Sequence, residues 1–252
     1  MAAGPGATDG SGPQSPDTPF AAASGPLELA RPETGVRLWL CGLERSINET
    51  ERLAGWLSAA EHTRAQRFGT DALRNRWIAG RATLRHLLGD SLGIAPAEVE
   101  LRRGVRGRPE LADRDSGIDF NVSHTHGVAL IGIAKGLAGH SRIGVDIERL
   151  DREVGVDRLA RKYLTATERA SLANLDLRQR RERFVRYWTC KEAMSKATAD
   201  GLIAPFGRLD VALSDTPRLV DGPAPYVPSQ WTLHRVAVPA AWAATIAIWR
   251  RG

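Results

Sequence analysis

The stretch WTCKEAMSK, residues 188–196, lies inside a run from Gln179 to Asp200 that contains neither proline nor glycine. Such a run predicts one long helix, which we expect to close at Gly201 because glycine readily adopts the left-handed conformation of a helix end. Positions 188, 191, 192 and 196 share one face of that helix. They carry an aromatic ring, two ammonium groups and a carboxylate, an unusual mixture for a face that only packs. The plainer alternative is a surface ion pair between Glu192 and Lys196.

A second group of polar residues falls in GVDIE, residues 144–148, whose alternation predicts a strand. On a strand, Asp146 and Glu148 point to one face, while the intervening aliphatic side chains point to the other. Two carboxylates on one face supply oxygen ligands of the kind that Mg²⁺ takes. A strand whose polar face simply contacts water is the alternative.

A third group, NVSH at residues 121–124, lies where another predicted strand ends. A hydroxyl and an imidazole at a strand end can bind a phosphate, with His124 as donor and Ser123 beside it. The pair is a poor hydrolase nucleophile and base, because adjacent residues of a strand point to opposite faces. The sequence also has no G-x-S-x-G elbow, Walker loop, G-x-G-x-x-G or zinc-ligand spacing. An ordinary polar turn is the alternative.

The second half of the chain resembles the first at one constant offset. The strand-like segment 36–43 corresponds to 143–150, and the capping box LSAAE at 57–61 corresponds to LTATE at 164–168. An ordered set of matches at one offset predicts an α+β protein of two pseudo-symmetric α+β half-domains. We expect the active site in the cleft between these half-domains.

Composition divides the chain into a tail and two half-domains. Residues 1–33 are dominated by Ala, Gly, Pro, Ser and Thr and predict a disordered tail. The N-terminal half-domain is expected over 34–140 and the C-terminal half-domain over 141–252. Within the first, the pattern predicts a helix from Asp71 that ends at Gly89.

The three motifs NVSH, GVDIE and W-x-x-K-E-x-x-x-K, in this order and spacing, resemble the 4′-phosphopantetheinyl transferase superfamily. The length and internal duplication resemble its larger, two-repeat, monomeric branch, which activates carrier proteins of nonribosomal peptide, polyketide and fatty acid synthesis. The resemblance covers about residues 36–250. It implies an enzyme that transfers the phosphopantetheine arm of coenzyme A to a serine of an apo acyl or peptidyl carrier protein, releasing adenosine 3′,5′-bisphosphate.

The resemblance also implies roles for residues of the second and third motifs. Asp146, Glu148 and Glu192 would hold Mg²⁺ against the pyrophosphate of coenzyme A. Glu192 would in addition take the proton of the carrier serine, and Lys196 would offset charge that develops on the phosphate. Lys191 would contact the pyrophosphate or the carrier protein. Trp188 is expected to pack between the halves rather than to react.

Further residues are implied for the nucleotide end of coenzyme A. His124 and Ser123 would contact its phosphates. The segment EHTRAQRF, residues 61–68, resembles the family helix that holds the 3′-phosphate, with Arg64 as the best candidate and Arg67 as a weaker one. The turn Gly107-Arg108-Pro109 resembles the Gly-Lys-Pro turn beside the adenine and 3′-phosphate, with Arg replacing Lys. A solvated surface charge is nevertheless the preferred interpretation for Arg67, as it is for Arg74 and Arg85.

Charge and cysteine content leave a broader set of functions open. The chain has 35 Lys+Arg against 29 Asp+Glu, which favours an anionic partner, here an acidic carrier protein. One alternative is an Arg-rich nucleic-acid-binding protein, and another is a non-catalytic relative that binds coenzyme A. Only two cysteines and no long apolar run or signal peptide indicate a cytoplasmic protein without a membrane span. We expect a monomer that binds no nucleic acid.

Overall fold

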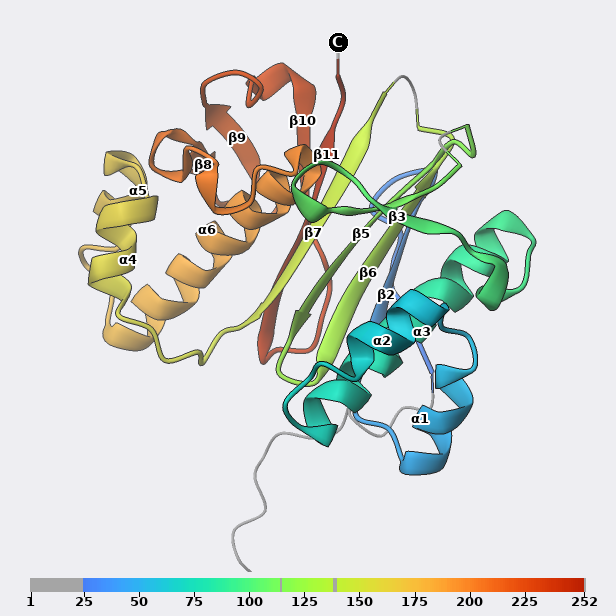
Figure 1. The fold of residues 1–252 in the computed structure, drawn as a ribbon. Helices are drawn as coiled ribbons and strands as arrows, with labels where there is room; N and C mark the ends of the chain where they lie inside the picture. Colours follow the sequence, from blue (N-terminus) through green and yellow to red (C-terminus); the bar gives the residue numbers. More distant parts are fainter. Residues whose placement is uncertain (1–24, 114, 138–139, 252) are drawn as a thin grey trace, which may run out of the picture.

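Two antiparallel sheets form the centre of the molecule, and one long helix covers the outer face of each (Figure 1). The computed structural model describes residues 25–113, 115–137 and 140–251. The first sheet has four strands in the order β1 (Leu27–Glu28), β2 (Val36–Gly42), β6 (Val128–Lys135) and β5 (Ile118–Thr125). The second has three strands in the order β10 (Trp231–Arg235), β11 (Trp242–Trp249) and β7 (Arg142–Arg149).

The helices and the smaller elements surround these sheets. The helices are α1 (Ile47–Ala54), α2 (Ala59–Ala65), α3 (Asp71–Leu92), α4 (Val156–Tyr163), α5 (Ala166–Ala170) and α6 (Leu177–Thr198). Two short hairpins are formed by β3 (Leu101–Arg103) with β4 (Pro109–Leu111), and by β8 (Asp210–Ala212) with β9 (Arg218–Asp221). Short 3₁₀ turns are η1 (Pro96–Glu98), η2 (Val105–Gly107), η3 (Gly201–Ile203), η4 (Phe206–Arg208) and η5 (Pro228–Gln230).

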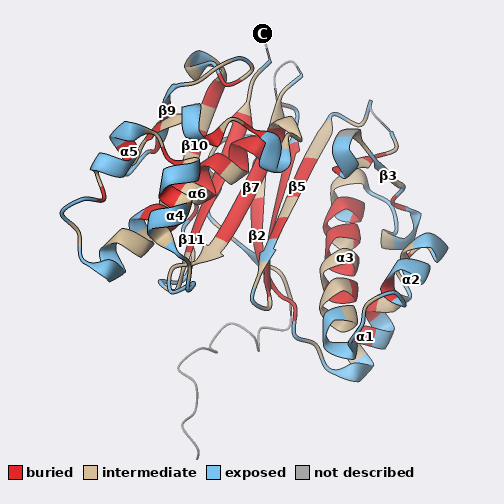
Figure 2. Cartoon of the chain, turned by 60° about the vertical axis from the view of Figure 1, so that its left-hand side comes forward, coloured by how far each residue is buried: buried red, intermediate tan, exposed pale blue. Residues whose placement is uncertain are grey.

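Three apolar clusters hold these layers together. One lies between α3 and the four-stranded sheet, and another between α6 and the three-stranded sheet. The third contains aliphatic residues of both sheets, so the inner faces of the two sheets share a core. Figure 2 shows the resulting pattern, with buried strands in the middle and the exposed faces of the helices outside.

The predicted duplication is confirmed. The order β2-β6-β5 in the first half matches β7-β11-β10 in the second. Both predicted capping boxes are present, at Ser58 with Glu61 and at Thr165 with Glu168. The long helices α3 and α6 each have 22 residues and occupy equivalent places against their sheets. The protein is therefore an α+β fold of two similar halves.

Neither long helix ends at the glycine that the sequence predicts: α3 ends later and α6 ends earlier. Helix α3 runs on to Leu92 and closes at Gly93, with φ +75°. Gly89 instead allows the chain after the helix to pack closely, since a Cβ there would lie 2.7 Å from the Ile94 carbonyl oxygen. Helix α6 closes at Ala199, with φ +65°, two residues before Gly201. Helix α1, with its own capping box at Ser46, was not predicted.

The boundary of the predicted tail is wrong at its inner end. Residues 1–24 lie outside the described residues. Leu27–Glu28, however, pairs with β2 as an edge strand. Glu28 accepts two hydrogen bonds from the Arg37 guanidinium, at 2.9 and 2.8 Å. Glu33 pairs with Arg250, at 2.6 Å. Ordered structure thus begins before residue 34.

The two sheets meet along a seam between β5 and β7 that is closed by side chains. Asp119, Asn121 and Ser123 lie on one face of β5 and accept hydrogen bonds from backbone N–H groups of β7. The donors are Ile143 at 2.7 Å, Val145 at 3.0 Å and Ile147 at 3.4 Å, respectively. Buried N–H groups must find acceptors, and here side chains of the other half supply them.

Helix α6 lies unusually close to β7 because of Gly144. A Cβ at this position would stand 2.0 Å from the Ala193 carbonyl oxygen and 2.6 Å from the Ala197 nitrogen. Both atoms belong to the backbone of α6, so the helix as a whole would have to move. The absence of a side chain at Gly144 therefore allows α6, which carries Glu192 and Lys196, to lie close to β7.

We predict that Gly144→Ala lowers the free energy of unfolding by about 3 kcal/mol, because the new methyl group has no space and displaces α6. Denaturant unfolding of the purified protein measures the change. Gly69→Ala is the matched control, since no atom lies within 4 Å of a Cβ at that position. Equal stability of the two variants would contradict the close helix–strand contact.

Candidate active site

Polar residues from three elements meet where the seam between the halves reaches α6. Strand β5 supplies Ser123, strand β7 supplies Asp146 and Glu148, and helix α6 supplies Glu192 and Lys196. As predicted, Asp146 and Glu148 alternate with aliphatic residues that are buried in the core shared by the sheets. The junction thus gathers residues of all three motifs from both halves of the chain.

Lys196 lies at the centre of this junction and contacts residues of both halves. The Lys196 ammonium donates to Asp146 Oδ1 at 2.7 Å and to Ser123 Oγ at 2.8 Å. The Ser123 hydroxyl in turn donates to Asp146 Oδ1 at 2.8 Å. Ser123 is buried, so the structure places it beneath the site as a link between Lys196 and Asp146. A phosphate contact by this hydroxyl, as expected from the sequence, would require it to leave those partners.

Three carboxyl groups lie close together around Lys196, and the pKa values of two of them are raised. Asp146 is buried, and its second oxygen, Oδ2, has no hydrogen-bond partner. Burial and then Asp146 raise the pKa of Glu192 to about 7, with Lys196 opposing the shift. Burial and then Asp146 also raise the pKa of Glu148, although Arg152 pairs with it at 2.7 Å. A further cation would relieve this repulsion.

The chemistry of these carboxylates fits a hard divalent cation. Asp146 offers a buried oxygen without a hydrogen-bond partner. Its carboxylate contributes to the raised pKa values of Glu148 and Glu192, so the three carboxyl groups interact electrostatically. Mg²⁺ usually takes one or two carboxylates and completes its shell with water and phosphate oxygens. Across the described residues, no three His, Cys, Asp or Glu side chains are already gathered into a metal-binding group. Such a cation would take the rest of its ligands from water and substrate oxygens.

His124 follows Ser123 at the end of β5 and is exposed. Partial burial of its ring and then the Lys196 ammonium lower the pKa of this imidazole. The imidazole can donate a hydrogen bond from a ring nitrogen. A phosphate contact by His124 stays a prediction.

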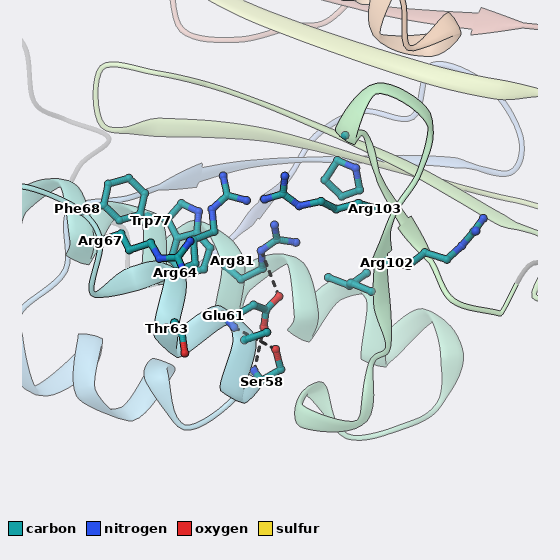
Figure 3. A pocket seen from close by; sticks show the side chains of 14 residues that line it. Ser58, Glu61, Thr63, Arg64, Arg67, Phe68, Trp77, Arg81, Arg102 and Arg103 are labelled. Atoms are coloured by element: carbon teal, nitrogen blue, oxygen red, sulfur yellow. Dashed lines mark hydrogen bonds and ion pairs between the residues drawn. The ribbon is translucent and has the colours of Figure 1, made fainter.

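A basic cavity of about 660 Å³ lies on the N-terminal half, between α2, α3 and the loop that precedes β4. Arg64 lines it, as predicted, and its guanidinium lies 5.6 Å from the centre of the Trp77 ring. Gly107 and Pro109 form part of its wall, and Arg67, predicted as a surface charge or a weak candidate, also borders it. In Figure 3 the Arg103 side chain reaches toward the arginines of the two helices, whereas Arg102 points away.

Arg81 and Arg103 are lining residues that the sequence did not single out. Burial lowers the pKa of Arg81, and Arg64, Arg85 and Arg103 contribute in the same direction, although Glu61 opposes them. Burial is the largest cause of this shift, and the contributions of the three arginines show that positive charges lie close together here. One sequence signal existed, because Arg81 follows Trp77 by one helical turn and so shares its face.

Two predicted arginines have structural partners instead. Arg85, expected as a surface charge, is buried and donates to Glu61 at 2.7 Å, so that expectation is wrong. Arg108 is also buried, and its guanidinium donates to the Asp119 carboxylate at 2.8 and 2.9 Å and to the Phe120 carbonyl at 2.9 Å. The structure contradicts a phosphate contact by this side chain. The remaining surface charge, Arg74, is half-exposed and pairs with Asp71 at 2.9 Å.

Lys191 and Trp188 also differ from expectation. Lys191 is fully buried, and its ammonium donates to Glu168 at 2.6 Å and to two backbone carbonyls. The predicted contact with coenzyme A or a carrier protein is therefore wrong. Trp188 packs against Tyr163, Phe184 and Phe206 inside the C-terminal half, not between the halves. Helical periodicity placed these residues near Glu192 but did not reveal which neighbours cover them.

The raised pKa of Glu192 predicts how stability depends on pH. The folded protein keeps a proton up to about pH 7 that the unfolded chain releases near pH 4.5. Its contribution to the free energy of unfolding is full below pH 4.5 and is lost as the pH rises through 7. We therefore expect metal-free Glu192→Gln to lose less stability than the wild type between pH 4.5 and 7. Urea unfolding in EDTA at several pH values measures this, and identical pH profiles would contradict the shifted carboxyl.

Comparison with known proteins assigns the chain to a family. A family model for the 4′-phosphopantetheinyl transferase superfamily matches residues 142–247, and one for the N-terminal domain of 4′-phosphopantetheinyl transferases matches residues 45–135. The 4′-phosphopantetheinyl transferase HetI of Nostoc is 39% identical over 184 residues, covering 72% of this chain and 75% of HetI. The 4′-phosphopantetheinyl transferase ffp of Bacillus subtilis is 25% identical, covering 69% and 74% of the two chains.

A solved holo-(acyl-carrier-protein) synthase from Bacillus anthracis is similar over 44% of this chain and 96% of its own, with 24% identity and a TM-score of 0.37. Within the described residues, no helix is long and apolar enough to cross a membrane. The two family matches fall on the two halves that the fold repeats. The chain belongs to the 4′-phosphopantetheinyl transferase superfamily and is a 4′-phosphopantetheinyl transferase.

Proposed function

We propose that this protein transfers 4′-phosphopantetheine from coenzyme A to a serine of an apo acyl or peptidyl carrier protein in a Mg²⁺-dependent reaction that releases adenosine 3′,5′-bisphosphate. The observation that carries the Mg²⁺ requirement is the buried Oδ2 atom of Asp146, which lacks a partner beside two carboxyl groups of raised pKa. An unpaired buried carboxylate oxygen is costly, and a cation shared with the substrate removes that cost.

Asp146, Glu148 and Glu192 are the residues that would hold the metal. A bound Mg²⁺ would polarise the phosphoryl oxygens of coenzyme A and align the leaving group. Asp146 is oriented for this task by Lys196 and Ser123, which both contact its other oxygen, Oδ1. The carboxylate is therefore already fixed before substrate binds.

Glu192 is the proposed general base. In transfer, the carrier serine oxygen forms a bond to the phosphorus that bears the pantetheine arm, and the bond from that phosphorus to the adenosine bisphosphate oxygen breaks. The serine proton passes to Glu192, directly or through a water. A carboxylate placed beside the serine hydroxyl is a chemically competent general base for its proton. Lys196 would offset charge on the phosphoryl oxygens in the transition state.

The basic cavity is the proposed site for the adenosine 3′-phosphate. Arg64, Arg81 and Arg103 supply crowded positive charge, and Trp77 supplies an aromatic face. The turn around Gly107 and Pro109 borders the same cavity. We retain the boundary between the half-domains after residue 140 as part of the proposal, with the nucleotide held by the first and the metal by the second. An acidic carrier protein fits the net charge of +6.

Intact-mass spectrometry of an apo carrier protein incubated with the enzyme, coenzyme A and Mg²⁺ tests the proposal. We expect the carrier to gain one phosphopantetheinyl group, with the gain abolished by EDTA and restored by excess Mg²⁺. Glu192→Gln should reduce kcat by at least about 100-fold, since it removes the general base. Arg74→Gln, at a half-exposed residue that is not among those lining the cavity, is the control with unchanged kcat. An unchanged rate in EDTA, or full activity of Glu192→Gln, would refute the metal or the base.

A further inference from the structure

A short segment of the N-terminal half reaches across to the end of the catalytic helix. In the turn 104–108, the Arg106 guanidinium donates to the Asp200 carboxylate, just beyond α6. The Arg108 guanidinium donates to the carbonyl oxygen of Lys196, in the last turn of α6. We call the first contact, the ion pair between Arg106 and Asp200, the inter-half clasp, and the Arg108 contact lies beside it. The clasp joins segments about ninety residues apart in sequence.

The backbone of the turn is built to present Arg106. This residue has φ +54° and ψ +25°, in the left-handed region that residues with a side chain seldom adopt. The Gly104 N–H donates to the Arg108 carbonyl at 2.7 Å, and the Gly107 N–H to the Gly104 carbonyl at 3.1 Å. A Cβ at Gly104 would lie 2.3 Å from the Glu110 carboxyl carbon, so the turn also packs tightly against its own strand. An unfavourable conformation held in this way commonly marks a functional position.

Asp200 is a firm anchor for the other end of the clasp. Its Oδ2 atom accepts the Tyr226 hydroxyl at 2.6 Å, and its N–H donates to the Ser195 carbonyl at 2.9 Å. Tyr226 is fully buried and stacks on Trp231, with ring centres 5.4 Å apart. Burial opposes ionisation of Asp200, but hydrogen bonds from Tyr226, Thr198 and Arg106 outweigh it and lower the pKa of Asp200. The carboxylate is thus charged and fixed, while the Arg106 side chain is half-exposed.

Both ends of the clasp touch groups that the reaction uses. Gly107 and Pro109, on either side of Arg108, line the basic cavity. Lys196, four residues before Asp200, holds Asp146 and Ser123 at the metal site. The clasp is therefore a mechanical link between the cavity wall and the catalytic helix. Without it, the wall segment keeps only the Arg108 contacts on this side.

We propose that Arg106 and Asp200 are positioning residues that hold the wall of the basic cavity against the catalytic helix and thereby set the affinity for coenzyme A. This inference rests on the proposed function, because it takes the cavity as the site of the nucleotide. The Lys196 ammonium keeps its own contacts to Asp146 and Ser123 when the clasp opens. Loss of the clasp should thus weaken coenzyme A binding far more than it slows transfer at saturating coenzyme A.

A double-mutant cycle with Arg106→Gln and Asp200→Asn tests this inference by calorimetric titration of the full-length enzyme with coenzyme A. Each single variant should raise the dissociation constant about three- to fivefold, the range expected for a half-exposed ion pair. The double variant should raise it no further, because either change already opens the clasp. Asn at 200 can still accept the Tyr226 hydrogen bond. Arg74→Gln, which removes another half-exposed ion pair at a residue that does not line the cavity, should leave the constant unchanged.

Transfer kinetics with the same variants separate positioning from general damage. KM for coenzyme A should rise with the dissociation constant, and kcat should stay within about twofold of the wild type. If Arg106 bound the nucleotide directly, Asp200→Asn would leave the affinity for coenzyme A unchanged or increase it. The effects of the two substitutions on the dissociation constant would then be independent in the double variant. That outcome, or an unchanged affinity in both single variants, would overturn the clasp. A wild-type enzyme that binds coenzyme A without transferring it would refute the proposed function. The double-mutant titration with coenzyme A would still test the clasp in that case, because it measures binding and not transfer.

Discussion

The seam between β5 and β7 is the interaction on which the rest of the structure depends. Alternate N–H groups of β7 point away from its partner β11, and they would be buried and unpaired without Asp119, Asn121 and Ser123. Since the acceptors are side chains, the two halves join without merging into one continuous sheet. The last acceptor, Ser123, also touches Lys196 and Asp146. The bonds that join the halves thus end in the active site.

Charge is divided between two places on the molecule. The junction holds three carboxyl groups beside Lys196 and Arg152, and burial together with the charge of Asp146 raises the pKa values of Glu148 and Glu192. The cavity on the first half instead gathers arginines, and burial together with the charges of Arg64, Arg85 and Arg103 lowers the pKa of Arg81. A ligand with a phosphate at one end and a metal-bound pyrophosphate at the other would complement both sites. Its phosphate would pair with the arginines of the cavity, and the metal would pair with the carboxyl groups of the junction. Coenzyme A has this distribution of charge, which agrees with the family assignment.

The fold and the centre of the site could be predicted from the sequence because their signals are local. Strand alternation placed Asp146 and Glu148 on one face, and capping boxes at Ser58 and Thr165 marked the repeat. The roles of long side chains could not be predicted, because they depend on neighbours distant in sequence. Lys191 turns from the helix face to Glu168, and Arg108 is drawn to Asp119. Motif positions identified where these residues lie, but only the packing revealed whether their charges are free for a ligand.

Amide hydrogen exchange along β7 is the most direct test of the seam, comparing the wild type with Asn121→Leu. The variant removes the acceptor of the Val145 N–H while keeping a side chain of similar size. We expect exchange at Val145 to accelerate strongly and at Ile143 and Ile147 to a lesser degree. The amides of Gly144 and Asp146, which face β11, should keep their protection. Unchanged protection at Val145 would show that the halves are held together by other means and would contradict this account of how the site is assembled.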